Sequence, residues 1–201
     1  MDYELIVVGA SWGGLHAVGA FLEGLGAQTS AAVVIAQHRS AEGGDELAHI
    51  LQGHTELPIR DAEDKDQVVP GTVLLAPQDY HLLIESGGTL ALSTEERVQF
   101  ARPSIDVLFE SAAEAYGDKC VGVVLTGANE DGAAGLARIK ELGGVAIVQD
   151  PGSAERGEMP AAALAAIHAD VVLPLEQIGL FLGGLLLETQ TICGIASASS
   201  R

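Results

Sequence analysis

The stretch that most constrains this chain is an apolar run near its N-terminus that stops at a glycine. Residues 5–8 read Leu-Ile-Val-Val, and Gly9-Ala10-Ser11-Trp12-Gly13 follows at once. Such a run is typical of a buried strand in a parallel sheet, and the glycines predict a tight turn into a helix. The turn also fits the pattern Gly-x-Ser-x-Gly, which presents a serine hydroxyl at the carboxyl edge of a sheet. The same pattern equally fits a glycine-rich turn without chemistry.

Strand and helix patterns alternate along most of the chain. Further buried strands are predicted at 31–36, 120–125, 145–148 and 171–173, with helices at 15–25, 42–51, 105–116, 133–142, 160–167 and 175–187. Three short strands at 72–75, 81–85 and 89–92 predict an antiparallel meander, preceded by a charged connection at 61–67. We therefore expect an α/β fold, namely a doubly wound, mostly parallel sheet in a three-layer α/β/α arrangement, with the meander added. One catalytic domain is expected over 1–188, with a flexible tail at 189–201.

Length and charge narrow the class of protein. The 201 residues suit one domain, and the hydrophobic share of 48% against 19% charged residues is typical of a globular chain. Ten Lys and Arg against 28 Asp and Glu give a net charge of −18, which disfavours nucleic acid and anionic membranes as partners. The acidic N-terminus lacks the basic region of a signal peptide, and the longest apolar run, 178–187, is too short for a membrane span. We therefore expect a cytoplasmic protein without membrane insertion.

Polar residues follow three of the predicted strands. Ser11 follows the first, His38 the second, and Asp131 ends the loop after the strand at 120–125. The carboxyl ends of parallel strands meet at one sheet edge, so these side chains are expected to lie together. A serine becomes a nucleophile when imidazole takes its proton, and a carboxylate then fixes the imidazole tautomer. The residues therefore suit a catalytic triad, although Asp131 also suits the N-cap of the next helix.

Several short segments, in one order along the chain, carry a resemblance to a known family. They are Val8-Gly9-Ala10-Ser11 with Gly13-Gly14, Gln37-His38, Pro70-Gly71, Ala76-Pro77 with His81-Leu82-Leu83, Arg102-Pro103-Ser104-Ile105-Asp106-Val107-Leu108-Phe109, Leu125-Thr126-Gly127, Asp131-Gly132-Ala133-Ala134-Gly135, Gln149-Asp150 and Met159-Pro160. From about residue 5 to 182 the chain resembles the catalytic domain of the chemotaxis protein-glutamate methylesterases, the CheB family.

The resemblance implies an activity and its residues. It implies hydrolysis of glutamate γ-methyl esters on the cytoplasmic region of chemotaxis receptors, often with deamidation of receptor glutamines. Ser11, His38 and Asp131 would form the triad, and no metal or cofactor would be needed. No receiver domain is expected before the first strand, and a separate receiver domain acting in trans is left open as a second partner.

The chain departs from the family around the predicted pocket. Trp12 stands where a small or hydroxylated residue is usual, Gly127-Ala128-Asn129 replaces Gly-Met-Gly, and Ala101 replaces a histidine. The backbone N–H groups of Trp12 and Ala128 are expected to bind the oxyanion. The Trp12 indole would either fill space left beside Ala128 or narrow the cleft. Arg102 is expected either to line the cleft or to form a structural ion pair.

Two alternative functions follow from these departures. One is an esterase of the same mechanism with another methylated or small substrate. The other is a catalytically idle binding module on the same fold. Two side chains are expected to be structural: His81 in a hydrogen bond, and Cys120 packed at a strand start.

Overall fold

The main sheet has seven parallel strands with β1 at its centre. The computed structural model describes residues 3–27, 29–39 and 46–198, with side chains as far as 186. The strands are β1 (Leu5–Ala10), β2 (Ala32–Gln37), β3 (Ile59–Asp61), β4 (Val73–Leu75), β7 (Cys120–Val124), β8 (Val145–Gln149) and β9 (Val171–Leu173), in the order β3-β4-β2-β1-β7-β8-β9. A separate antiparallel hairpin joins β5 (His81–Ile84) to β6 (Leu90–Ser93).

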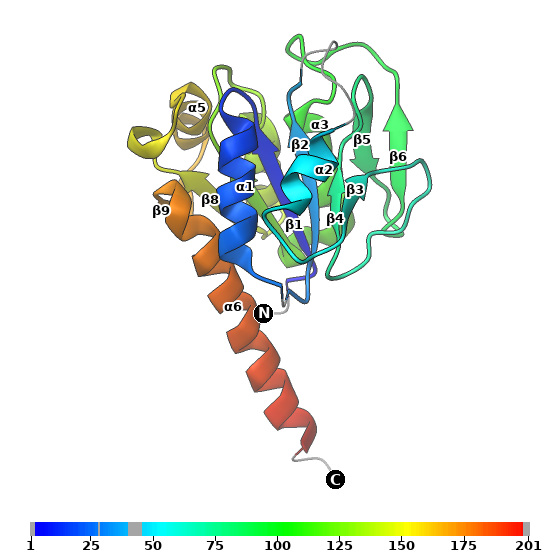
Figure 1. Cartoon of the computed structure of the whole chain (residues 1–201), viewed down its shortest axis with the longest axis vertical. Helices are drawn as coiled ribbons and strands as arrows, with labels where there is room; N and C mark the ends of the chain where they lie inside the picture. The colour runs from blue at the N-terminus through cyan, green and yellow to red at the C-terminus, as the bar shows by residue number, and fades with distance from the viewer. Residues whose placement is uncertain (1–2, 28, 40–45, 199–201) are drawn as a thin grey trace.

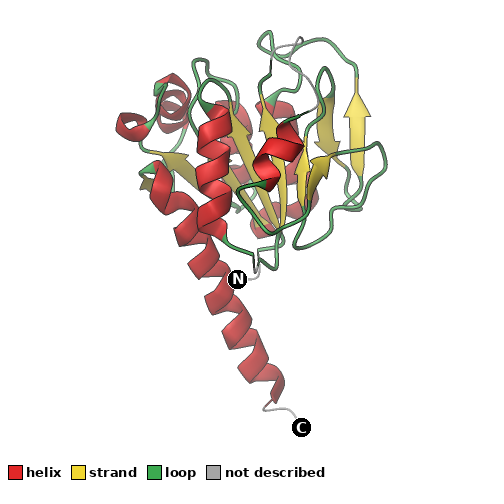
Figure 2. Ribbon diagram, viewed as in Figure 1, coloured by secondary structure: helices red, strands yellow, loops and turns green. Residues whose placement is uncertain are grey.

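Helices cover both faces of the sheet, as Figures 1 and 2 show. They are α1 (Gly14–Leu25), α2 (Leu47–Gln52), α3 (Ile105–Tyr116), α4 (Ala133–Glu141), α5 (Glu158–Ala166) and α6 (Leu175–Ala198), with 3-10 turns at Gly117–Lys119 and Pro151–Ser153. Alternate residues of β1 face opposite layers. Leu5 and Val7 share a core with α3, α4, α5 and the hairpin, whereas Ile6 and Val8 share one with α1, α2 and α6. The predicted doubly wound α/β fold is confirmed.

The antiparallel part of the molecule has two strands rather than three. The segment predicted as the first meander strand is β4, which lies in the main sheet and pairs in parallel with β2 and β3. All three of its residues are buried, as expected for a strand covered on both faces. The charged connection at 61–67 also begins inside a strand, because β3 ends at Asp61. This short, partly exposed edge strand carries charges, which is common at sheet edges.

Two helices differ from their predicted bounds. α2 begins at Leu47, and the predicted start at 42 lies outside the described residues. α6 continues to Ala198, past the predicted end at 187, and Figure 1 shows its second half extending beyond the body of the protein. The sequence from 188 to 198 contains no proline that would stop a helix. The flexibility of 189–201 stays a prediction. In the described part of the chain, no helix is long and apolar enough to cross a membrane.

α1 and α6 pack in close contact through glycines. A Cβ atom on Gly179 of α6 would lie 2.2 Å from the carbonyl oxygen of Phe21, and one on Gly183 would lie 2.7 Å from that of Leu25. A larger residue at either position would push the two helices apart. α6 is therefore fixed against the helix that begins just after Ser11.

Candidate active site

The candidate site lies where the strand order reverses around β1. β2 lies on one side of β1 and β7 on the other, so the loops after these three strands meet at one edge. Ser11 follows β1 directly. The N–H of His38 donates to the carbonyl of Ala10 at 3.0 Å, which continues the β1–β2 pairing to the edge. The N–H of Ser11 donates to the carbonyl of Thr126 at 2.9 Å and anchors the loop after β7.

The structure brings Ser11, His38 and Asp131 into one hydrogen-bonded row. Ser11 Oγ lies 3.1 Å from His38 Nδ1, and His38 Nε2 lies 2.8 Å from Asp131 Oδ2. A carboxylate only accepts hydrogen bonds, so Nε2 carries the proton and Nδ1 is free to accept one. Nδ1 therefore faces the serine as a base. The His38 side chain is mostly buried and that of Asp131 is fully buried.

Asn129 is a fourth member of this row. Its Nδ2 atom lies 3.2 Å from His38 Nδ1, and its Oδ1 accepts the N–H of Asp131 at 3.3 Å. The amide nitrogen thus competes with the Ser11 hydroxyl for the single lone pair of His38 Nδ1, while the amide oxygen holds the loop that carries the carboxylate. The sequence analysis named Asn129 only as part of a loop that departs from the family pattern. Asn129 replaces a family glycine with a side chain that can both donate and accept. That replacement could have indicated its hydrogen-bonding role.

The Asp131 carboxylate is held by the N-terminus of α3. Oδ1 accepts from Ser104 Oγ at 2.9 Å and from the N–H of Asp106 at 3.0 Å, and Oδ2 accepts from the N–H of Ile105 at 2.8 Å. Burial opposes ionisation of this group. The hydrogen bond from His38 and those from the α3 N–H groups outweigh it and hold the pKa of Asp131 below its ordinary value. The alternative role of Asp131 as N-cap of α4 is not met, because Gly132 is the N-cap of α4; Asp131 instead accepts N–H groups at the start of α3, whose N-cap is Ser104.

Asp106 makes the reverse contact, from the first turn of α3 to the start of α4. Its Oδ1 accepts from the N–H groups of Gly132 at 2.9 Å and Gly135 at 2.7 Å, and Gln99 Nε2 donates to Oδ2 at 3.1 Å. Burial, together with the nearby Asp131 carboxylate, raises the pKa of Asp106 to about 6, although the two glycine N–H groups act against this. A carboxylate from each side thus accepts N–H groups at the start of the other helix. The pKa of Asp106 is raised and that of Asp131 is lowered. Sequence reasoning gave Asp106 no role.

The backbone beside Ser11 leaves two N–H groups for an oxyanion. The N–H of Gly127 is used, since it donates to the carbonyl of Arg156 at 3.0 Å. Within the described residues, the N–H groups of Trp12 and Ala128 have no acceptor. Gly127 instead makes room: a Cβ atom there would lie 2.9 Å from Ser11 Cβ and 2.7 Å from Met159 Sδ. Gly127 therefore shapes the site through its lack of a side chain.

The Trp12 indole forms an exposed surface next to Ser11. Its Nε1 donates to Glu155 Oε1 at 3.0 Å, and the Arg156 guanidinium lies 5.5 Å from the ring centroid. The residue is 60% exposed. An indole with that exposure does not fill a buried gap beside Ala128. Its alternative role, narrowing the cleft, stays a prediction. Its polar contacts come from the loop before α5, which the sequence did not indicate.

Two predicted structural residues also border the site. Arg102 donates to Asp79 Oδ1 from Nη2 at 2.9 Å and also to two backbone carbonyls, and it lines a pocket beside His38. Arg102 thus forms an ion pair and also borders this pocket, and its role toward a substrate stays a prediction. His81 is buried; its Nδ1 accepts from the N–H of Ser104 at 3.2 Å and its Nε2 donates to the carbonyl of Glu96 at 3.0 Å. This confirms its predicted structural hydrogen bonding.

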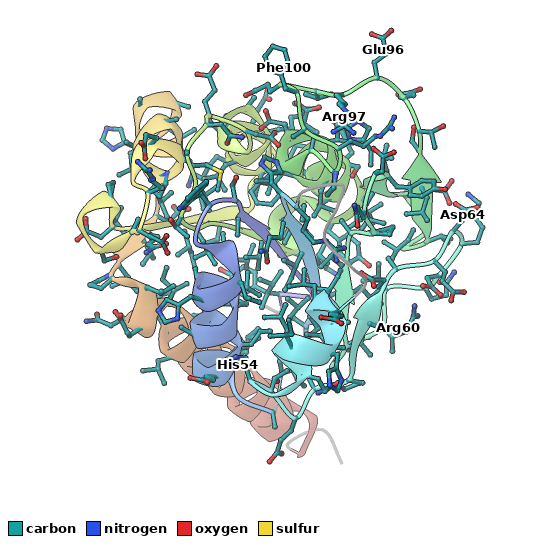
Figure 3. All side chains as sticks on the ribbon, turned by 45° about the horizontal axis from the view of Figure 1, so that its top comes forward. His54, Arg60, Asp64, Glu96, Arg97 and Phe100 are labelled. Atoms are coloured by element: carbon teal, nitrogen blue, oxygen red, sulfur yellow. The ribbon has the colours of Figure 1, made fainter. Side chains whose placement is uncertain are left out.

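A tight turn presents Phe100 at the rim of the site. Val98 and Ala101 exchange two backbone hydrogen bonds, and Gln99 and Phe100 between them both have positive φ, at 47° and 66°. Such turns favour Asn and Gly, so this one is strained. Phe100 is 95% exposed, and Figure 3 shows it at the outer edge near Arg97. Across the part of the chain that the structure describes, no three His, Cys, Asp or Glu side chains converge as metal ligands.

Comparison with known proteins assigns the family. Residues 6–182 match the family model for CheB methylesterase. The chain belongs to the CheB methylesterase family. The crystal structure of the Thermotoga maritima CheB methylesterase catalytic domain is similar with a TM-score of 0.86 at 31% identity, over 92% of this chain and 100% of that domain. The fold around Ser11 is thus that of a CheB catalytic domain.

CheB relatives of two lengths match the chain. A Leptospira interrogans protein, assigned provisionally by its name to the protein-glutamate methylesterases/protein-glutamine glutaminases, is 50% identical over 89% of this chain and 92% of its own length. The protein-glutamate methylesterase FrzG of Myxococcus xanthus is 40% identical over 88% of this chain and 53% of its own length. The chain thus spans most of the first protein and about half of the second.

Proposed function

We propose that this protein is a serine esterase that hydrolyses γ-methyl esters of glutamate side chains on methylated chemotaxis receptors in the cytoplasm. The observation that carries the proposal is the hydrogen-bonded row of Ser11, His38 and Asp131 at the carboxyl edge of a CheB-family sheet. The methylesterase names of the similar proteins support the substrate class.

The geometry supports a two-step acyl transfer. Ser11 Oγ attacks the ester carbonyl while His38 Nδ1 takes its proton, and Asp131 stabilises the imidazolium through Nε2. The N–H groups of Trp12 and Ala128 donate to the oxyanion. The C–O bond to the methoxy group then breaks, and methanol leaves with the proton from His38. Water, deprotonated by His38, attacks the acyl-serine and releases the glutamate carboxylate and free Ser11.

A second activity, deamidation of receptor glutamines, uses the same groups. The similar Leptospira protein carries a provisional name that includes protein-glutamine glutaminase. A carboxamide presents the same carbonyl to Ser11, and the leaving group is ammonia, protonated by His38. The acyl-serine intermediate and its hydrolysis are then identical.

Methanol release from methylated receptor membranes tests the proposal. Wild-type protein should release methanol, and Ser11→Ala should not. A serine-reactive phosphonate should also label the wild-type protein and leave Ser11→Ala unlabelled. Labelling without methanol release would favour an esterase for another methylated substrate. Absence of both would favour a catalytically idle binding module.

A further inference from the structure

A small pocket rich in arginine adjoins His38. It encloses about 220 Å³ and is lined by three arginines, Arg39, Arg97 and Arg102, together with His38, Asn129 and the turn that carries Phe100. We refer to it as the arginine pocket. No carboxylate of the described residues lines it. In a chain with a net charge of −18 and ten basic residues, three arginines in one small pocket are a marked local concentration.

Arg39 carries unused hydrogen-bonding capacity at this pocket. Its side chain is only 10% exposed, and Nη2 donates to Ala76 O at 2.8 Å and Asp61 Oδ1 at 3.2 Å. Among the described residues, its Nε and Nη1 atoms are buried and have no hydrogen-bond partner. A buried guanidinium donor without an acceptor is costly, and a ligand or an ordered water usually completes it. The Arg39 guanidinium, which borders the arginine pocket, therefore has donor capacity that an anion or a water can satisfy.

The three arginines of the pocket carry one more charge than the carboxylates with which they pair. Arg97 and Arg102 both donate to Asp79 Oδ1, at 2.7 and 2.9 Å, and Arg39 is paired with Asp61. Three guanidinium groups against two carboxylates leave one positive charge. Planar guanidinium groups suit the two oxygens of a carboxylate. A carboxylate-bearing side chain thus fits the arginine pocket in charge and in shape.

We propose that the arginine pocket binds a second, unesterified carboxylate of the substrate while a methyl ester lies at Ser11. The inference rests on the proposed function and deepens it, since it makes the preferred substrate a methyl ester with a free acidic side chain nearby. Hydrolysis of one ester then creates a carboxylate that assists binding of the next ester. Demethylation of a segment with several sites therefore speeds up as it proceeds.

Two matched peptides test this proposal. Each forms a helix with one glutamate γ-methyl ester and has either Glu or Gln four residues away, on the same helix face. Binding is measured in a Ser11→Ala background from the fluorescence of Trp12, the single tryptophan of the chain, which lies beside the site. The Glu peptide should bind about tenfold more tightly than the Gln peptide, as expected for a charge-assisted pair in a partly buried pocket.

Arginine variants assign the preference to the arginine pocket. Arg39→Gln should abolish the preference for the Glu peptide. Arg97→Gln should reduce that preference by about half on a logarithmic scale. Arg97 is half-exposed, so the fold tolerates its loss. Arg60→Gln is the matched control, because Arg60 pairs with Asp66 outside the arginine pocket, and it should keep the full preference.

The outcomes separate the two proposals. The arginine pocket proposal is wrong if the peptides bind equally, if neither binds, or if the preference survives in both Arg39→Gln and Arg97→Gln. Methanol release by the wild-type protein from methylated receptor membranes then still supports the esterase. If no methanol is released but the Glu peptide still binds more tightly, the proposed esterase function is wrong and the proposed carboxylate site stands. If inorganic phosphate inhibits binding of the Glu peptide as strongly as acetate does, the pocket binds anions in general, and the assignment to a carboxylate is overturned.

Discussion

The two sides of Ser11 differ sharply in how firmly they are held. On the inner side, Asp131 is fully buried and accepts hydrogen bonds from His38, Ser104 and two N–H groups of α3. On the outer side, Trp12 is 60% exposed, and Phe100, at 95%, stands on a two-residue turn. The inner side is fixed many times over by the fold, whereas the outer side is fixed by few contacts. The triad is thus held by helix ends, and we expect the choice of substrate to depend on the rim.

Most departures from the family pattern follow the same division. Trp12, Ala101 and Ala128 lie on the outer side, and the inner residues Ser104 and Asp131 keep the family pattern. Asn129 is the exception, because it contacts His38 and the N–H of Asp131 on the inner side. A change on the rim disturbs few internal hydrogen bonds and alters what the cleft can bind. Substitutions on the two sides should therefore differ in the size and in the kind of their effect.

The largest effect is expected at the nucleophile itself. Ser11→Ala should lower kcat by about 10⁶-fold, by analogy with removal of the serine from a protease triad. The melting temperature should stay within a degree or two, because Ser11 Oγ contacts only His38 among the described side chains. Methanol release and thermal unfolding measure the two quantities. Retention of a tenth of the wild-type rate would contradict the nucleophile assignment.

A smaller loss of rate, joined to a loss of stability, is expected at Asp131. Asp131→Asn should lower kcat by about 10⁴-fold, because the amide favours the wrong imidazole tautomer. It should also lower the free energy of unfolding by about 1–3 kcal/mol, since an amide nitrogen cannot accept the N–H of Ile105. Denaturant unfolding beside a rate assay tests both. An unchanged free energy of unfolding would mean that the hydrogen bonds to Asp131 stabilise the fold less than their geometry indicates.

The third effect concerns pH and Asp106. Its pKa is about 6 in the folded protein against 3.8 as the ordinary value, so between these pH values the folded state keeps a proton that the unfolded state has lost. Its contribution to stability is present below pH 4 and is lost as pH rises through 6, by about 3 kcal/mol in total. Asp106→Asn should lack this loss.

Unfolding free energies of both proteins from pH 4 to 7 measure the Asp106 effect. The stability of the wild type relative to Asp106→Asn should fall across this range. Asn keeps an oxygen that can accept from Gly132 and Gly135, so the variant should fold and retain activity within a few-fold. A constant difference in stability between the two proteins would show that Asp106 is already ionised at pH 4.

The smallest effects are expected on the outer side. Phe100→Ala and Trp12→Ala should change stability by less than about 0.5 kcal/mol, because exposed side chains contribute little. Both should raise KM for methylated receptor by a few-fold and leave kcat nearly unchanged, as expected for lost binding contacts. Leu180→Ala, at an exposed residue of α6, is the control and should alter neither. A fall in kcat would mean that the rim residues contribute to the chemical step, and the distinction between the two sides would then be wrong.

The triad on the inner side could be predicted from the sequence, whereas the long-range hydrogen bonds that hold it could not. Ser11, His38 and Asp131 could be placed together because each follows an unbroken apolar strand, and parallel strands bring such ends to one edge. The exchange between Asp106 and Asp131 joins residues 25 apart in sequence, and the Trp12 to Glu155 bond joins residues 143 apart. No local pattern records such contacts. β4 was misassigned because a short apolar run does not reveal the direction of its partner.

The mutual capping of α3 and α4 has a consequence for how the protein opens and closes. N–H groups at the start of each helix donate to a carboxylate from the other side: Asp131, just before α4, accepts from Ile105 and Asp106, and Asp106 of α3 accepts from Gly132 and Gly135. Protection against hydrogen exchange at residues 105, 106, 132 and 135 should therefore rise and fall as one unit. A molecule that loosens either helix releases Asp131 from His38 in the same event. We therefore expect partly opened molecules to lack esterase activity.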